Sequence, residues 1–138
     1  ARFDLTKLVP ILESVHSRLS CVVIENLDYK EFIPRYDRPE TLFYLDPPYY
    51  LSESDYGRDI FSRDEFPKMS QMLREISGKF ILSINDHIEI RRLFSEFFIK
   101  EVNVRYTVGL ASNDKDFGEL IVSNFNLDEF QSRDLFSQ

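Results

Sequence analysis

Hydrophobic residues along the chain fall into two kinds of run. Two short and nearly continuous runs, at 41–45 and 80–84, predict buried strands. Longer stretches carry apolar residues at helical spacing and predict amphipathic helices. The first expected helix spans 8–19, with Leu8, Ile11, Leu12, Val15 and Leu19 on one face, and the second follows residue 62, with Phe66, Met69, Met72, Leu73 and Ile76.

Polar residues at the borders of the apolar runs predict where helices begin. Three pairs have the spacing of a capping box: Asp28 with Glu31, Ser62 with Glu65, and Asp86 with Glu89. In such a box the first side chain accepts a hydrogen bond from a free amide of the first turn, and the second acid reaches back. Gly78 is expected to end the second helix, and the third carries Leu93, Phe94 and Phe97.

Three further strands complete the expected sheet. The β-branched run at 21–24 predicts a short strand, and the alternating Val102, Val104 and Tyr106 predict another. A loop at 109–118 separates the latter from the apolar run at 120–122, so these two strands are expected to form an antiparallel pair. From residue 126 the tail is acidic and expected to be helical. Strands alternating with helices predict one doubly wound α/β domain over residues 1–138.

The run at 41–45 ends abruptly at Asp46-Pro47-Pro48-Tyr49-Tyr50. Proline can neither donate to a sheet ladder nor extend it, so the strand must give way to a rigid loop here. Asp46 is therefore displayed at the carboxyl end of the strand, where ligands bind in open α/β sheets. Each proline also restricts the residue before it, which fixes the backbone carbonyls in advance. A carboxylate, rigid carbonyls and an aromatic ring suit a planar molecule that bears an amino group.

This stretch resembles the DPPY motif of the amino-methyltransferases, which methylate exocyclic amines of nucleic-acid bases with S-adenosylmethionine. The segment at 23–29 lies upstream of the motif and those at 78–85, 104–106 and 118–124 follow it in matching order, so that most of the chain is similar to the later half of a Dam-like DNA adenine methyltransferase. The resemblance implies a Rossmann-like methyltransferase sheet that ends in an antiparallel strand pair. It also implies an incomplete sheet, because two strands that the family places between the strand at 21–24 and the DPPY strand have no counterpart here.

The resemblance implies roles for individual residues around the motif. Asp46, Pro47, Pro48 and Tyr49 would form the catalytic set, with Asp46 and the Pro47 carbonyl accepting from the target amine and Tyr49 stacking on the base. Asp28 and Tyr29, with Asp46, would meet the donor. Asp28 has an equally good interpretation as a plain helix cap.

Residues that would face nucleic acid form a separate set: Tyr50, Arg58, Ser83 and Asn85. A solvated arginine and ordinary turn chemistry are the competing interpretations for the last three. The chemistry requires no metal, and no cluster of histidines or cysteines suggests one.

Composition changes this picture in two respects. The formal net charge of −7 over 138 residues argues against autonomous binding to nucleic acid, since phosphate contacts supply most nonspecific affinity. Cys21 is the only cysteine, which excludes an internal disulfide and fits a reducing cytoplasm, and its apolar surroundings predict a buried thiol. No signal peptide or membrane span is indicated. The chain begins with Ala1, which hints at a processed, trimmed or dissected protein.

The sequence therefore leads to an adenine-specific DNA methyltransferase, with S-adenosylmethionine as methyl donor and double-stranded DNA as substrate. The family's glycine-rich donor loop has no counterpart, since the four glycines are scattered, so negligible activity is expected from this chain alone. Self-association, or pairing with an N-terminal fragment, would cover the exposed strand edges. Two alternatives remain open: a methyltransferase acting on RNA or on protein amides, and a non-catalytic remnant that binds a partner.

Overall fold

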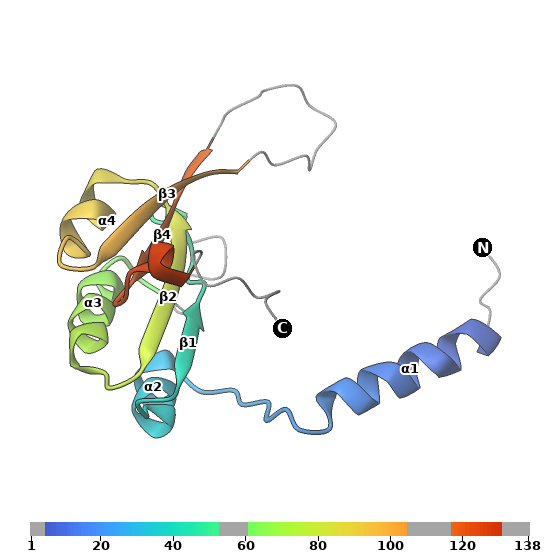
Figure 1. Cartoon of the computed structure of the whole chain (residues 1–138). Helices are drawn as coiled ribbons and strands as arrows, with labels where there is room; N and C mark the ends of the chain where they lie inside the picture. Colours follow the sequence, from blue (N-terminus) through green and yellow to red (C-terminus); the bar gives the residue numbers. More distant parts are fainter. Residues whose placement is uncertain (1–4, 53–60, 105–116, 131–138) are drawn as a thin grey trace.

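The computed structural model describes residues 5–52, 61–104 and 117–130 and has a mixed α/β fold (Figure 1). The helices are α1 (Leu5–Leu19), α2 (Tyr29–Tyr36), α3 (Glu65–Glu75) and α4 (Ile88–Leu93). The strands are β1 (Leu42–Leu45), β2 (Lys79–Asn85), β3 (Phe98–Val104) and β4 (Phe117–Ser123). A 3₁₀ helix, η2 (Leu127–Phe130), follows β4, and the rest of the expected helical tail lies outside the described residues.

The four strands form one sheet in the order β1-β2-β4-β3. Strands β1 and β2 are parallel and are joined through α3, whereas β4 is antiparallel to both β2 and β3. The two strands expected from the apolar runs are confirmed as β1 and β2, but the expected burial is wrong for β1, where Leu42 and Tyr44 are exposed. The expected closing antiparallel pair is confirmed as β3 and β4.

The hydrophobic core lies on one face of this sheet. Alternate residues of the strands point toward it, and α2, α3 and α4 supply the opposing side chains. Its fully buried members include Ile33, Phe66, Leu73, Phe80, Leu82, Ile84, Ile90, Phe94, Leu120 and Val122. The other face is open at β1, where Leu42 and Tyr44 are 57% and 67% exposed. Helices of the described fold therefore cover one side of β1 only.

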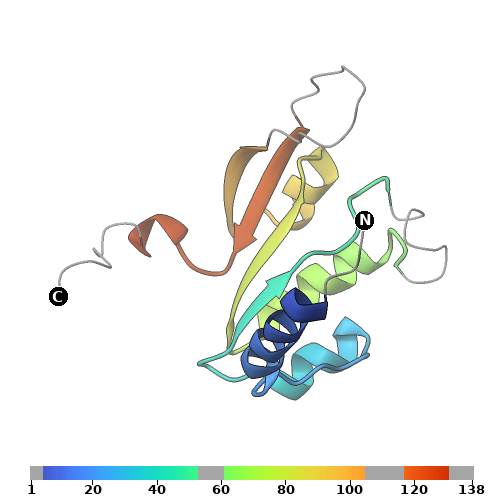
Figure 2. The same ribbon diagram turned by 90° about the vertical axis from the view of Figure 1, so that its right-hand side faces the viewer.

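Helix α1 lies apart from the sheet and its helices (Figures 1 and 2). The expected amphipathic helix is confirmed and extends to Leu5, with Pro10 inside it. Its apolar residues are exposed, among them Val9, Ile11, Leu12, Val15 and Leu19. Among the described residues, no helix combines the length and apolar character needed to cross a membrane.

The strand expected at 21–24 is wrong. This segment has no regular structure, and Val22, Val23 and Ile24 are 52%, 73% and 82% exposed. A strand requires a neighbour for its backbone groups, and none of the described strands reaches this segment. For the same reason the expected burial of Cys21 is wrong, since its thiol is exposed.

The capping predictions had different outcomes. Asp28 caps α2 as expected, because its Oδ1 accepts from the Lys30 amide at 2.9 Å. Helix α3 instead has Asp64 at its cap, and no side chain satisfies its first amides, so the box of Ser62 and Glu65 is wrong.

Helix α4 is capped by His87, whose Nδ1 accepts from the Glu89 amide at 3.1 Å. The predicted cap, Asp86, is wrong because its carboxylate binds the Arg91 guanidinium with two contacts of 2.6 Å. A bidentate arginine pair is a stronger partner for a carboxylate than a single backbone amide.

Candidate active site

The residues of the acid–proline loop lie at one edge of the sheet. Asp46 follows β1 directly, and the parallel strand β2 ends at the same edge with Asn85. Because β4 runs antiparallel, its early residue Glu119 pairs with Asn85 in the register. The carboxyl edge of β1 and β2 thus brings together an exposed carboxylate, an amide and a buried carboxylate.

A hollow of about 290 Å³ opens beside Asp46. Tyr29 and Asp46, two residues of the expected donor-binding set, lie in the same lining, whereas Asp28 does not. The lining is otherwise mainly apolar and consists of Leu27, Phe32, Tyr44, Leu45, Pro47, Phe61 and Met69. Apolar walls with one carboxylate suit an aromatic ring that carries an amino group.

Asp46 and Pro47 differ in their surroundings. The Asp46 side chain is exposed, and none of the described residues forms a hydrogen bond or ion pair with its carboxylate. Pro47 is buried beneath it. A free carboxylate next to a buried, rigid proline can accept a hydrogen bond from a ligand without first breaking another contact.

The tyrosines after the prolines are fastened to the sheet. The Tyr49 hydroxyl donates to the Glu119 carboxylate of β4. The Tyr50 amide donates to Asn85 Oδ1 at 2.8 Å, and Asn85 Nδ2 donates to the Tyr50 carbonyl at 3.1 Å. These contacts fix the loop between β1 and residue 52 to the ends of two neighbouring strands.

The Tyr50 ring packs into the fold. Its centroid lies 4.4 Å from the ring of His87 and 5.4 Å from that of Phe66, and the Arg63 guanidinium lies 5.1 Å away. The next residue, Leu51, has a φ of 75°, a left-handed conformation that is costly for a side chain with a Cβ. Ser52 donates its amide to the Tyr49 carbonyl at 2.9 Å and closes the turn. The loop thus holds a strained position directly after the motif.

The expected nucleic-acid set is not brought together as one surface. Asn85 is half-buried and engaged with the Tyr50 backbone, Ser83 is 9% exposed, and Arg58 lies outside the described residues. In the described part of the site, Asp46 lines the hollow, Tyr49 follows outside its lining, and Tyr50 and Asn85 hold the loop to the sheet.

Glu65 and Glu119 are two site residues that sequence reasoning missed. Glu65 was assigned to a helix cap, but its side chain turns to the start of α2, where it accepts from Tyr29 and Lys30 at 2.8 Å each. Hydrogen bonds from Lys30, Lys68 and Tyr29 lower the pKa of the Glu65 carboxyl to about 2. Glu119 is a buried residue of the mainly apolar strand β4. Its charge within an apolar run was the one sequence signal that could have identified it.

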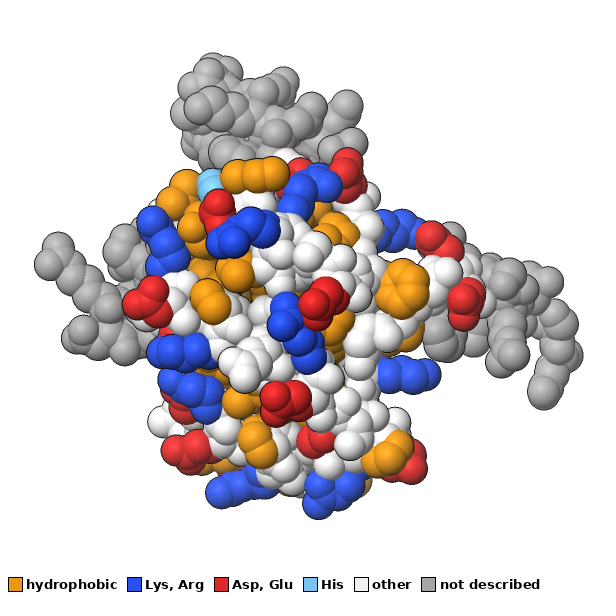
Figure 3. Space-filling view, turned by 90° about the vertical axis from the view of Figure 1, so that its left-hand side faces the viewer, with side chains coloured by type: hydrophobic (Ala, Val, Ile, Leu, Met, Phe, Trp, Pro, Cys, Tyr) orange, Lys and Arg blue, Asp and Glu red, His pale blue; other side chains and the backbone are white. Residues whose placement is uncertain are grey.

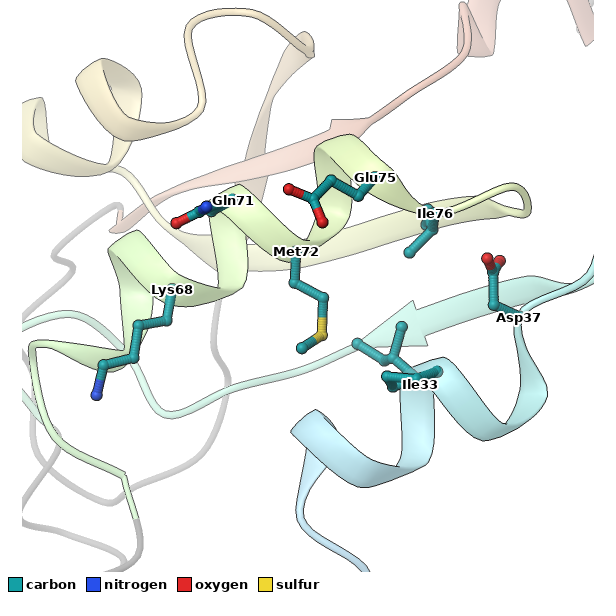
Figure 4. A pocket seen from close by; sticks show the side chains of 8 residues that line it. Ile33, Asp37, Lys68, Gln71, Met72, Glu75 and Ile76 are labelled. Atoms are coloured by element: carbon teal, nitrogen blue, oxygen red, sulfur yellow. The ribbon is translucent and has the colours of Figure 1, made fainter.

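A second and larger hollow, of about 400 Å³, lies between α2 and α3 (Figure 4). Met72 extends from α3 toward Ile33 of α2, with Asp37 at one end and Lys68 at the other. Both Asp37 oxygens accept backbone amides, those of Ser77 and Gly78 at 2.8 Å, which explains its lowered pKa. This hollow shares no lining residue with the one beside Asp46, and the exposed Glu75 carboxylate lines it too. Neither size nor a carboxylate therefore selects the site, whereas the position of Asp46 at the carboxyl end of the parallel strands does.

The face formed by α3 and α4 has intermixed charges (Figure 3). Its cations pair with acids: Arg74 with Glu96 at 2.8 Å, Arg92 with Glu89 at 2.9 Å and Arg91 with Asp86 at 2.6 Å. Cations already paired with carboxylates have less to gain from phosphates, so this face does not favour DNA binding.

Comparison with known proteins places these features in a family. No curated protein gives a match. The family model described as D12 class N6 adenine-specific DNA methyltransferase matches residues 2–108, which include the acid–proline loop and the hollow beside it. This match spans well over half of the chain and agrees with the Dam-like resemblance in the sequence. The chain belongs to the D12 class N6 adenine-specific DNA methyltransferase family.

Proposed function

We propose that the hollow beside Asp46 is the methyl-transfer site, where the exocyclic amine of an adenine in DNA receives a methyl group from S-adenosylmethionine. The observation that carries this proposal is the free Asp46 carboxylate at the end of β1, in one lining with Pro47 and Tyr29. Its position at the carboxyl end of parallel strands is where α/β sheets bind ligands. The finer description of the fold, a Rossmann-like methyltransferase sheet, is part of the same proposal.

Asp46 and Pro47 act on the amine of the target base. The lone pair of this amine is delocalised into the ring, so the nitrogen is a poor nucleophile. Asp46 accepts one amine hydrogen and the Pro47 carbonyl accepts the other, which draws the nitrogen toward tetrahedral geometry and stabilises its developing positive charge. Pro48 keeps the Pro47 carbonyl in place through its restriction of the backbone. Neither group has to remove a proton before transfer: the N–C bond would form as the S–C bond of the sulfonium breaks, and the methylated amine would then release its extra proton to Asp46 or to water.

Tyr49 stacks on the flipped base. Stacking of a base on an aromatic side chain contributes about 1–3 kcal/mol. The hydrogen bond from its hydroxyl to Glu119 leaves the ring as the part available to a ligand. Tyr50, Arg58, Ser83 and Asn85 are proposed for the nucleic-acid side, with Asn85 acting through the backbone of Tyr50.

Tyr29 and Asp46 form the donor side of the hollow, and Asp28 is proposed for the donor from just outside the lining. The residues present fit an adenosyl group, because the apolar lining can cover a ring and the carboxylate can accept from an amino group. When bound, the sulfonium supplies an electrophilic methyl group. The Tyr29 ring would pack on the donor's base. Asp28 has one oxygen on the Lys30 amide and the other 3.8 Å from Lys30 Nζ, and this second oxygen would accept from an amino group. No glycine-rich turn follows a strand in the described residues, so the chain alone is proposed to have negligible activity.

A partner is the second part of this proposal. Exposed apolar residues on α1 and at β1, including Leu12, Val15, Leu42 and Tyr44, favour association with another copy or with a fragment that supplies further strands. The same exposure supports the alternative of a non-catalytic, partner-binding remnant. An RNA or protein amino-methyltransferase is a further alternative, but the family match supports DNA.

Two experiments test the proposed function. Isothermal titration of the chain with S-adenosylmethionine, repeated with Asp28→Ala, tests the donor side, and binding weakened by the substitution is the expected result. A methylation assay on adenine-containing duplex DNA, with an added N-terminal fragment of a family member, tests the transfer. Asp46→Ala is expected to abolish transfer while preserving the circular dichroism spectrum, and retained activity would refute the role of Asp46. A sharp monomeric mass by light scattering at high concentration would count against self-association.

A further inference from the structure

We infer that Glu65 is a positioning residue for the donor side of the hollow, where it fixes the Tyr29 ring through the phenolic hydroxyl. The inference rests on the proposed function, in which this ring meets the donor. It adds a residue from α3 that does not line the hollow itself. Glu65 touches neither the donor nor the target base and acts only through Tyr29 and Lys30.

Three donors converge on the Glu65 carboxylate. Tyr29 Oη donates to Oε2 at 2.8 Å, Lys30 Nζ donates to the same oxygen at 2.8 Å, and Lys68 Nζ donates to Oε1 at 2.8 Å. Tyr29 and Lys30 are the first residues of α2, and Glu65 is the first residue of α3. One carboxylate therefore joins the starts of the two helices that flank the hollow.

Burial makes this contact specific. Glu65 is only 9% exposed, so its charge depends on the three donors for the solvation that water supplies elsewhere. Its pKa is low because Lys30, Lys68 and Tyr29 donate to it, and the carboxylate remains charged throughout the neutral range. Burial, together with the hydrogen bond to Glu65, raises the pKa of the Tyr29 phenol, which keeps the hydroxyl proton available for donation.

The ring of Tyr29 is held at two points. Its hydroxyl is bound by Glu65, and its ring lies against Phe61, with centroids 6.2 Å apart. Both aromatic residues line the hollow beside Asp46. Without the carboxylate the phenol would keep only the Glu65 backbone carbonyl, at 3.4 Å, and the ring would be held less firmly, so the methyl donor would have to order it on binding. Glu65 supplies this order before the donor arrives.

A double-mutant cycle on donor affinity tests the inference. Glu65→Leu removes the acceptor at similar volume, Tyr29→Phe removes only the hydroxyl, and the third variant combines both. Each single variant is expected to weaken S-adenosylmethionine binding to the full chain about tenfold, as measured by isothermal titration. The combined variant is expected to lose no more than either single variant, because both remove the same contact.

Two further variants separate positioning from general stability. Glu65→Gln keeps an acceptor oxygen and is expected to retain most of the affinity. Glu96→Gln removes an exposed carboxylate that pairs with Arg74 and is expected to leave the affinity unchanged. Circular dichroism of each variant identifies any loss of folding, and if Glu65→Leu does not fold, the affinity of Tyr29→Phe alone decides the test.

The outcomes distinguish the two proposals. If the unaltered chain does not bind S-adenosylmethionine, the proposed donor site is overturned, and the positioning role of Glu65 with it. Binding by the unaltered chain with an unchanged affinity in Tyr29→Phe overturns the part of Glu65 alone. Strictly additive losses in the two single variants also overturn it, since they would mean that the carboxylate and the hydroxyl act independently.

Discussion

The Glu65 carboxylate should make the free energy of unfolding depend measurably on pH in the acidic range. Its pKa is about 2 in the folded protein, against an ordinary value of 4.5, because Lys30, Lys68 and Tyr29 donate to the charged form. A group whose pKa is lower in the folded state stabilises the fold above its unfolded pKa. This contribution is lost as the pH falls from about 4.5 through about 2. Glu65→Gln removes the titration.

The size of the contribution follows from the same values. A displacement from 4.5 to about 2 is equivalent to about 3 kcal/mol of preference for the charged form. The Lys30 and Lys68 side chains are 43% and 59% exposed, so water screens both ion pairs and reduces the contribution to about 1–2 kcal/mol. At about pH 7 the free energy of unfolding of the unaltered chain should exceed that of Glu65→Gln by this amount. The difference between the two free energies should shrink by more than half by about pH 3.

Urea unfolding followed by circular dichroism measures both quantities. Asp37 and Asp86 also have lowered pKa values, from the Ser77 amide and the Arg91 guanidinium respectively, so total stability will fall in acid for both proteins. The difference between the two proteins isolates Glu65. A difference that stays constant from about pH 7 to about pH 3, or that grows in acid, would refute the assigned network.

Four other substitutions test the sheet and the loop fixed to it by urea unfolding. Asn85→Ala should lower the free energy of unfolding by about 2 kcal/mol, since two half-buried backbone groups of Tyr50 lose their partners, and a loss below about 0.5 kcal/mol would contradict this role. Gly78→Ala should cost about 1–3 kcal/mol, because a Cβ would lie 2.8 and 2.9 Å from two carbonyl oxygens, and Gly118→Ala should cost less, with its nearest atom at 3.3 Å. Leu51→Asn should raise stability by roughly 0.5–1 kcal/mol by relieving the left-handed strain, and unchanged stability would refute that strain.

Local patterns were sufficient to predict the elements that form the core. The runs at 41–45 and 80–84 became β1 and β2, because a continuous apolar run with helices on either side has few other ways to bury its side chains. The Asp28 cap and the position of Asp46 at a strand end also follow from local chemistry. These residues respond to neighbours close in sequence or to a generic apolar environment.

Features that depend on distant partners could not be predicted. Glu65 is three residues from Ser62 and fitted a capping box, yet Tyr29 and Lys30, more than thirty residues earlier in the chain, bind it instead. Asp86 likewise exchanged an expected amide for the Arg91 guanidinium. The tertiary fold brings Lys30 to Glu65, whereas Arg91 lies only five residues after Asp86. In both cases a cationic donor is a stronger partner for a carboxylate than a backbone amide.

The segment at 21–24 is not a strand, and one face of β1 is open, for the same reason: none of the described elements packs against either of them. Parallel strands normally have both faces covered, yet β1 pairs only with β2 and leaves Leu42 and Tyr44 exposed. Val23 and Ile24 have strand-forming side chains but no strand beside them, and α1 has an apolar face with no described element packed on it. The hollow beside Asp46 lies between this uncovered region and the packed helices α2 and α3. In the proposed site, Tyr29 is therefore held by the packed helices, whereas Tyr44 of the same lining lies on the uncovered face of β1. Donor affinity should depend on Glu65 and also on whatever covers β1.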